Sequence, residues 1–345
     1  MPMIKLLNTL YVLSGDAYLT LDNGNVVVNR DGNESGRFPL HTIGAIEYFG
    51  YKGVSPSLIG ECASRGIDLS FFTCHGRFLA RTVGEERGNV FLRQQQYRIS
   101  DNEGQSLAIA RNMIAAKVFN ARWVIERSIR DHPMQVDKEV MKRCSNNLAE
   151  YTRQAREASS MDELRGIEGL AARCYFSHFN DMIFAKDEFL RFNGRSKRPP
   201  MDAPNAMLSF AYSLLTNDCA SALEGVGLDP YVGLMHVERP GRKSLALDLV
   251  EELRAPVADR AVLTCINNRM FNEKSFERRP DGSVYLSELG RPKFLDVWQR
   301  RKREQIRHPY LKNKITWGLV PHMQAMLLAR YIRGDIDGYP PFMWK

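Results

Sequence analysis

Three polar side chains that lie close together in the sequence have the types and spacing of a metal centre. His236 comes shortly before a predicted helix that carries Asp248 and Glu251, and residues three apart share one face of a helix. An imidazole nitrogen with carboxylate oxygens suits Mn²⁺ or Mg²⁺ better than zinc or copper. The set is flanked by basic residues, Arg239, Arg242, Lys243 and Arg254. This combination predicts an anionic substrate and therefore phosphodiester chemistry.

Each of these residues taken alone also has an ordinary structural explanation. A histidine near a helix end commonly bonds the backbone, and most acids on helices are solvated. The segment 244–254, however, is apolar over much of its helical circumference, so at least one acid should be partly buried. A buried acid must be paired, hydrogen-bonded or bound to metal. Tyr212 is a candidate to line the same site, although an aromatic residue at helical spacing is more often part of the core.

Glu168 is the best candidate for a further ligand from elsewhere in the chain. It stands between Gly166 and Gly169 in a predicted helix. Glycine inside a helix costs about 1 kcal/mol relative to alanine. Two glycines around one carboxylate are easier to understand if a neighbouring helix or a DNA backbone approaches the surface closely. The alternative is that Glu168 is an ordinary solvated helix residue.

Two basic segments indicate a nucleic-acid partner. Residues 191–198 carry four Lys or Arg and residues 291–314 carry nine, interleaved with aromatic residues. Such residues neutralise phosphates and stack on unpaired bases. We interpret Trp298 as a core residue because of its helical spacing, and the run 300–303 as a nucleic-acid contact. The predicted DNA-binding residues are Arg198, Arg242, Lys243, Arg254, Arg300, Arg301 and Arg303.

Composition sets the frame for these sites. A chain of 345 residues with 44% hydrophobic residues is long enough for two domains. The formal charge is +8, of which residues 1–100 contribute +1, so the anionic partner should bind the C-terminal part. The six cysteines stand singly without a C-x-x-C pair, which disfavours a zinc knuckle or a disulfide framework. No apolar run at the N-terminus is long enough for a signal peptide or membrane span, so we expect a cytoplasmic protein without membrane contact.

The elements that must position these residues predict a two-domain α+β protein, with a small N-terminal β-sandwich-like domain and a larger all-α catalytic domain. Residues 1–85 alternate β-formers with turn signals, including the hairpin signal Asn23-Gly24, and Pro39 restricts its strand to an edge. We do not expect a parallel nucleotide-binding sheet there. Residues 86–102 are expected to be a linker, with a helix as the alternative. Residues 103–345 are expected to form helices with one small hairpin at 275–287.

Several motifs resemble the CRISPR-associated integrase family, the first of the two universal spacer-acquisition proteins. The more specific ones are Gly166–Gly169, Gly233–His236 and Ser244–Glu251. Further segments resemble the branch found in type I-C systems, namely 6–12, 74–81, 198–205 and 335–342. The resemblance extends over essentially the whole chain.

This resemblance implies that Glu168, His236 and Glu251 are metal ligands and that Asp248 is a further acid of the active site. It implies a dimerising N-terminal domain and a homodimer, two copies of which hold a dimer of the small second adaptation protein and a short DNA duplex. An accessory adaptation nuclease is a further expected partner. The expected reaction is attack by the 3′-hydroxyl of the incoming DNA on a repeat-end phosphate, assisted by Mn²⁺ or Mg²⁺.

Two other classes of function compete with this interpretation. A non-catalytic DNA-binding scaffold would explain the basic segments. His236→Ala tests this alternative: in an enzyme, the substitution should abolish strand joining while duplex binding stays largely intact. A metal-dependent hydrolase of small phosphate esters is disfavoured by the extended basic surface, which predicts salt-sensitive binding to duplex DNA.

Overall fold

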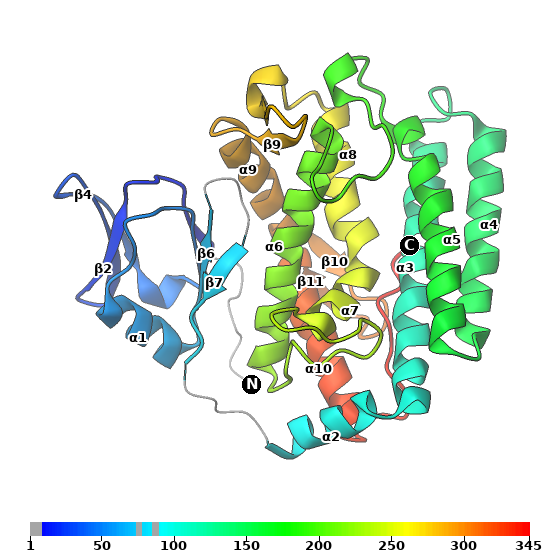
Figure 1. The fold of residues 1–345 in the computed structure, drawn as a ribbon, viewed down its shortest axis with the longest axis horizontal. Coiled ribbons are helices and arrows are strands. Elements are labelled where there is room, and N and C mark those ends of the chain that lie inside the picture. The colour runs from blue at the N-terminus through cyan, green and yellow to red at the C-terminus, as the bar shows by residue number, and fades with distance from the viewer. Residues whose placement is uncertain (1–8, 74–77, 85–89) are drawn as a thin grey trace. The chain divides into compact units, whose positions relative to one another are not determined.

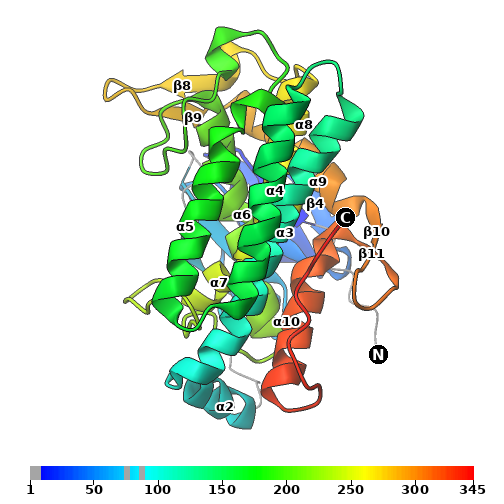
Figure 2. The same cartoon turned by 90° about the vertical axis from the view of Figure 1, so that its right-hand side faces the viewer.

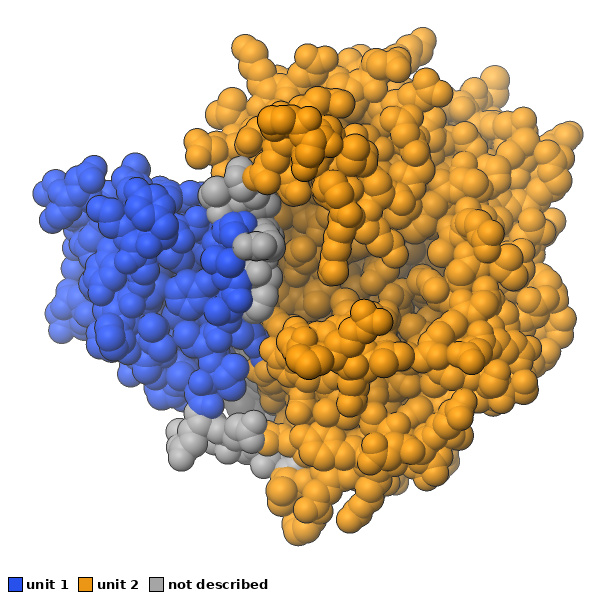
Figure 3. All heavy atoms as spheres, in the orientation of Figure 1, with its two compact units in different colours: residues 1–87 blue, residues 88–345 orange. Residues whose placement is uncertain are grey.

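The computed structural model describes residues 9–73, 78–84 and 90–345. The chain folds as two compact units, residues 1–87 and 88–345, which are coloured separately in Figure 3. The expected order, a β-rich N-terminal region followed by a helical C-terminal region, is confirmed (Figure 1). Parts of two family-like motifs, 6–8 and 74–77, lie outside the described residues, as do positions 86–89 of the expected linker.

Two sheets make up most of the first unit. The order in the four-stranded sheet is β1 (Thr9–Val12), β5 (Ala45–Tyr48), β6 (Asp68–Phe72) and β7 (Phe78–Arg81). The antiparallel three-stranded sheet contains β2 (Tyr18–Asp22), β3 (Asn25–Arg30) and β4 (Asn33–Pro39). Buried side chains from both sheets, among them Leu19, Val26, Ile46 and Leu69, meet in one core with helix α1 (Pro56–Arg65). Two sheets therefore share a core, as expected.

Two local predictions in this unit are confirmed and one is wrong. Asn23 and Gly24 join β2 to β3 with φ values of 46° and 72°, the positive angles that a tight hairpin turn needs. The strand that contains Pro39 lies at a sheet edge. Contrary to our expectation, β1, β5 and β6 pair in parallel. Parallel neighbours need a crossover connection. Helix α1, which ends at Gly66 with a φ of 68°, connects β5 to β6, and the segment that contains β2, β3 and β4 connects β1 to β5.

The second unit is mainly helical. Its α-helices are α2 (Val90–Ser100), α3 (Glu103–Asp131), α4 (Lys138–Glu157), α5 (Met161–Ser177), α6 (Ala203–Gly225), α7 (Ser244–Leu253), α8 (Arg260–Asn267), α9 (Gly290–Arg303) and α10 (Val320–Ile332). A π-helical turn, Arg254–Asp259, joins α7 to α8. Helices α3, α4 and α5 lie side by side in Figures 1 and 2, and α7 packs on α3 and α6.

Two hairpins show that the expectation of an all-α second domain is wrong. β8 (Phe276–Arg278) pairs with β9 (Val284–Leu286), which confirms the small hairpin expected at 275–287. β10 (Gln305–Arg307) pairs with β11 (Lys314–Thr316), in a region where only helices were expected. β-Branched residues in both strands favour extended structure, and Pro309 with Lys312, whose φ is 59°, turns the chain between them.

Residues expected as a linker are partly a helix of the second unit. Helix α2 buries Gln96, whose amide donates to the backbone carbonyls of Asp229 and Val232 at 2.8 and 3.0 Å. The loop that contains Asp229 and Val232 leads to His236. Helix α2 therefore fastens the segment that carries the predicted histidine ligand, which the polar composition of 86–102 does not indicate.

The segment 339–342 returns to the helices that carry the predicted site. The carboxylate of Glu252 is fully buried and accepts hydrogen bonds from three donors, the side chains of Gln324 and Tyr339 and the backbone N–H of Phe342. Asn120 on α3 donates to the carbonyl oxygens of Glu252 and Phe342, both at 2.7 Å. These bonds anchor α7 at the residue directly after Glu251.

We expect this anchor to make stability depend on pH. Burial raises the pKa of Glu252 to about 7, because its effect is larger than that of the hydrogen bonds, which lower the pKa. Its folded-state pKa lies above the unfolded one, so its stabilising contribution is complete at low pH and is lost as pH rises through 7. Relative to the neutral variant Glu252→Gln, the unfolding free energy of the wild type should fall by on the order of 3 kcal/mol between about pH 5 and 8. Urea unfolding at several pH values measures this, and a pH-independent difference between the two proteins would contradict it.

Two cysteines of neighbouring helices lie close together. The sulfur atoms of Cys144 on α4 and Cys174 on α5 are 3.0 Å apart, a proximity that the scattered cysteine positions do not predict. The cysteines in the described ranges are unbridged. Within those ranges, every helix is too short or too polar to cross a membrane.

Candidate metal centre

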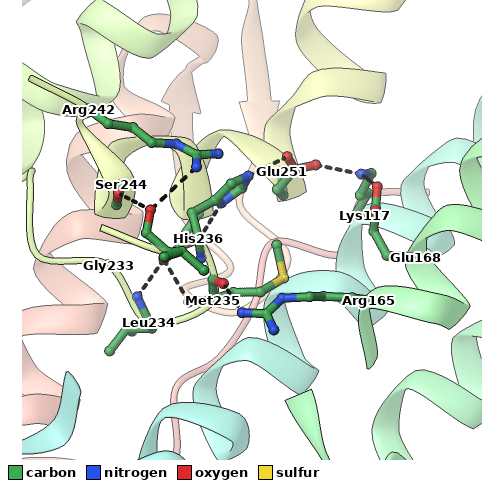
Figure 4. A network of polar contacts seen from close by, with 12 residues as sticks. Lys117, Arg165, Glu168, Gly233, Leu234, Met235, His236, Arg242, Ser244 and Glu251 are labelled. Atoms are coloured by element: carbon green, nitrogen blue, oxygen red, sulfur yellow. Dashed lines mark hydrogen bonds and ion pairs between the residues drawn. The ribbon is translucent and has the colours of Figure 1, made fainter. Parts of the chain in front are cut away.

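The predicted ligands come from three separate segments of the second unit. Glu168 lies on α5, His236 lies in the loop between α6 and α7, and Glu251 lies on α7. Helix α5 begins where Ser160 caps it, because the Ser160 side chain accepts a hydrogen bond from the backbone N–H of Glu163. Figure 4 shows Lys117 of α3 between Glu168 and Glu251, with His236 on the other side of Glu251. The structure thus brings them into one region.

Lys117 pairs with both carboxylates. Its Nζ atom hydrogen-bonds Glu168 Oε1 and lies 2.7 Å from Glu251 Oε2. On the other side of Glu251, Oε1 lies 2.9 Å from an Arg254 nitrogen and 3.8 Å from His236 Nε2. Glu251 is therefore the central acid, surrounded by two permanent cations and one imidazole.

Charge compensation keeps Glu251 ionised although its side chain is only 4% exposed. Burial alone would raise its pKa, but Arg254, Lys117 and His236 outweigh burial and hold the pKa at about 2. A buried carboxylate that stays charged is a strong ligand for a hard divalent cation.

Asp248 holds His236 in place and is not turned toward the carboxylates. Its Oδ1 lies 2.6 Å from His236 Nδ1. Its two oxygens also accept the backbone N–H groups of Leu234, Met235 and His236 at 2.7 to 3.1 Å. A carboxylate on Nδ1 favours the tautomer whose Nε2 carries a lone pair. Asp248 and Glu251 thus face the two nitrogens of the same ring, which agrees with their helical spacing.

The loop that carries His236 is held by close packing. A Cβ atom on Gly233 would lie 2.6 Å from Ser244 Cβ and 2.7 Å from the carbonyl oxygen of His236, so only glycine fits. Arg165 on α5 donates to the Met235 carbonyl at 3.0 Å, as Figure 4 shows. Helix α5 therefore carries a predicted ligand and also holds the loop that contains His236.

The two glycines beside Glu168 face open space. A Cβ on Gly166 or Gly169 would meet nothing within 4 Å. Of the two explanations we gave for them, a neighbouring helix of the same chain is therefore excluded within the described residues. The other explanation, the close approach of a DNA backbone, remains a prediction.

The predicted DNA-binding arginines and lysines fall into different settings. Arg254 is committed to Glu251, and the Arg301 side chain, 14% exposed, bonds Glu304 and the Pro256 carbonyl. Arg242 and Lys243 lie in the loop before α7, where Arg242 bonds the Val237 carbonyl. The remaining three, Arg198, Arg300 and Arg303, are exposed. Only these exposed residues are placed like ordinary phosphate contacts.

A pocket lies directly beside the carboxylates. It is lined by Lys117 and Glu168 together with Arg195, Tyr212, Arg254 and Asp259. The Tyr212 hydroxyl lies 2.6 Å from Asp259 Oδ1, and the Arg254 guanidinium lies 4.9 Å from the centre of the tyrosine ring. Burial raises the pKa of Asp259 to about 6 despite these partners. Tyr212 thus lines the site, whereas its spacing favoured a core position.

The residues present fit a divalent cation in their chemistry. Two carboxylates and one imidazole nitrogen are donors that Mn²⁺ accepts well and Mg²⁺ tolerates. As placed, however, no three His, Cys, Asp or Glu side chains within the described ranges stand close enough to share one ion. The Lys117 ammonium lies between Glu168 and Glu251. Its position shows where the two carboxylates together stabilise a positive charge.

The sequence prediction missed Lys117 and Arg165. Lys117 is a single cation in the apolar run Met113–Phe119, and its side chain is only 15% exposed. A lone lysine in an apolar helix segment is a usable signal, since lysine is rarely buried without a partner. The bond from Arg165 to a backbone carbonyl has no comparable signal in the sequence.

Residues 10–300 match the family model described as CRISPR associated protein Cas1. The chain is 46% identical to CRISPR-associated endonuclease Cas1 1 of Chlorobaculum tepidum, over 99% of this chain and 100% of that protein. It is 45% identical to CRISPR-associated endonuclease Cas1 2 of Rhodospirillum rubrum, with the same coverage. It is also 34% identical to a Cas4 exonuclease/Cas1 endonuclease fusion of Geobacter sulfurreducens, over 97% of this chain and 60% of the fusion.

Solved structures share this fold at lower sequence identity. The Cas1 protein TM1797 of Thermotoga maritima superposes with a TM-score of 0.80 at 23% identity, over 95% of this chain and 97% of that one. A casposase bound to integration product gives a TM-score of 0.84 at 21% identity, over 98% and 94%. A chain of a Cas6-RT-Cas1–Cas2 complex gives 0.79 at 21% identity, over 99% of this chain and 36% of that one.

Proposed function

Because this chain belongs to the CRISPR associated protein Cas1 family, we propose that it is a divalent-metal-dependent DNA endonuclease and integrase that inserts short foreign duplexes into a CRISPR array. The relatives that are 45–46% identical over their full lengths carry the name endonuclease. The casposase bound to integration product shares the fold, which supports the joining reaction. We retain the type I-C-like branch as part of this proposal, on the motifs at 198–205 and 335–342.

One observation carries the proposal. Glu168 and Glu251, from two helices, meet at the buried Lys117 ammonium, and His236, from a third segment, turns its Nε2 toward the other oxygen of Glu251. We propose these three residues as the metal ligands. Asp248 is a positioning residue, because all its contacts described above go to His236 and the loop before it.

The reaction replaces one phosphodiester by another. The oxygen of a 3′-hydroxyl loses its proton and bonds to phosphorus. The bond from phosphorus to the leaving 3′-oxygen breaks, and that oxygen takes up a proton to become a new 3′-hydroxyl. Water in place of the attacking hydroxyl gives hydrolysis. A bound Mn²⁺ or Mg²⁺ supplies charge stabilisation at the phosphoryl oxygens. The pocket residue Arg195 places further positive charge beside the proposed ligands, suited to the phosphate of the strand.

The partners follow from the same family. We propose a homodimer formed through the N-terminal unit, and assembly with the small second adaptation protein on double-stranded DNA. The Cas1–Cas2 complex among the structural neighbours supports that assembly. The relative in which Cas4 exonuclease and Cas1 endonuclease are fused supports an accessory nuclease as a further partner.

Metal removal tests the proposal. Incubation with EDTA should abolish joining of a labelled duplex to a repeat-containing plasmid, and excess Mn²⁺ or Mg²⁺ should restore it, with Mn²⁺ at least as effective because a nitrogen ligand is present. Product formation is followed on denaturing gels. Duplex binding, measured by fluorescence anisotropy in the same buffers, should change little. Joining that persists in EDTA would refute metal dependence.

A further inference from the structure

Lys117 occupies the space between the two proposed carboxylate ligands. Its Nζ hydrogen-bonds Glu168 and lies 2.7 Å from Glu251, and its side chain is only 15% exposed (Figure 4). We propose that Lys117 is a built-in competitor for the divalent ion: its ammonium holds the ligand carboxylates together in the metal-free protein and has to be displaced when the ion binds. This inference rests on the proposed metal centre.

Electrostatics explains why a cation is needed there without metal. Glu168 and Glu251 have side chains that are 28% and 4% exposed, so water screens their repulsion weakly. An uncompensated buried charge is strongly destabilising. Arg254 neutralises one side of Glu251 at 2.9 Å. Lys117 neutralises the other side and is the group of this network that joins both carboxylates.

Geometry explains why the lysine and the ion exclude each other. Mg²⁺ binds oxygen at about 2.1 Å and Mn²⁺ prefers similar ligands. An ion that bonds both carboxylates would have to stand where the ammonium now lies. Accordingly, no three potential ligand side chains of the described residues share a common position while Lys117 is in place.

The displaced side chain has room to move. Lys117 also lines the pocket that contains Tyr175 and Tyr212 beside the carboxylates. A lysine is a compact charge on a flexible four-carbon stem, so it changes position without movement of helix α3. Figure 3 shows that the second unit is hollowed on the viewed face, in the region where Figure 1 places α7 between α6 and α3.

The test measures metal binding and stability without DNA. Free Mn²⁺ is titrated by electron paramagnetic resonance against the full-length wild type, Lys117→Met and Lys117→Gln. Both variants should bind Mn²⁺ more tightly, by about tenfold or more, because the ion no longer displaces an ammonium. Without metal their melting temperatures should be lower than that of the wild type, and Mn²⁺ should raise them by more. A variant that folds only with Mn²⁺ supports the inference, and failure to fold in both conditions counts against it.

Two controls separate the possible failures. Lys142→Met removes a lysine–glutamate pair of 2.6 Å between Lys142 on α4 and Glu126 on α3, and it should leave Mn²⁺ affinity unchanged. His236→Ala should lose Mn²⁺ binding. If His236→Ala binds Mn²⁺ as the wild type does, the proposed metal centre is wrong. If His236→Ala loses binding but Lys117→Met binds no more tightly than the wild type, the centre stands and the competitor role of Lys117 is overturned.

Discussion

His236→Ala should abolish strand joining while leaving affinity for duplex DNA nearly unchanged. The imidazole is the nitrogen donor of the proposed centre, and its Nε2 lies 3.8 Å from Glu251. Loss of residues that merely support a ligand typically costs 10–100-fold in metal affinity or activity, so loss of the ligand itself should cost about 100-fold or more. Joining is measured on gels under single-turnover conditions, and binding is measured by anisotropy at the same salt concentration.

The matched control is His178→Ala. His178 also forms a histidine–aspartate pair, 2.9 Å from Asp181, but at the C-terminal end of α5. This variant should join DNA normally. If binding and joining fell together in His236→Ala, the ligand role would be in doubt, and the DNA-binding scaffold would become the better description. Full joining activity in His236→Ala would reject the proposed centre.

Asp248→Asn is expected to reduce both Mn²⁺ affinity and joining by about 10–100-fold. Asp248 accepts three backbone N–H groups and the Nδ1 side of His236. Asparagine offers one acceptor oxygen and turns an N–H₂ group toward these donors, so the histidine loses the partner that fixes its tautomer. The affinity is measured by Mn²⁺ titration without DNA, alongside the melting temperature.

A second buried acid provides the comparison. Asp202 caps α6, is 6% exposed and accepts N–H groups of Asn193 and Asn205. Asp202→Asn should lower the melting temperature to a similar degree but leave Mn²⁺ affinity intact. If Asp248→Asn likewise lost only stability, Asp248 would be a structural residue without influence on the metal ligands.

The parts of the site that could be predicted are the residues that lie close together in the sequence on one helix. Asp248 and Glu251 are three residues apart on one helix, and the structure places them on the two nitrogens of the same imidazole. Glu168 was predicted from the two glycines beside it and from the family resemblance. Its distance from His236 in the sequence is too large for helical spacing to show that the two side chains meet. Lys117, which joins Glu168 to Glu251, comes from α3, and only tertiary packing brings it there.

The fold was predictable to a similar extent. The Asn23-Gly24 hairpin and the edge position of Pro39 follow from backbone angles that these residues favour or forbid. The parallel pairing of β5 with β6 depends on how α1 crosses the sheet, which periodicity does not encode. The hairpin of β10 and β11 was not predicted because no glycine separates the basic helix from the short strand that follows it, so the sequence carries no signal that the helix ends there.

The π-helical turn between α7 and α8 has a consequence for natural sequence variation. It separates Glu251 from Asp259, so it fixes which side chains face the proposed metal ligands and which face Tyr212. An α-helix rotates by about 100° per residue. Insertion or deletion of a single amino acid between positions 251 and 259 would therefore turn Asp259 and the whole of α8 to another side. We therefore expect the protein to tolerate a change of length in this short stretch less well than a change of length in a surface loop.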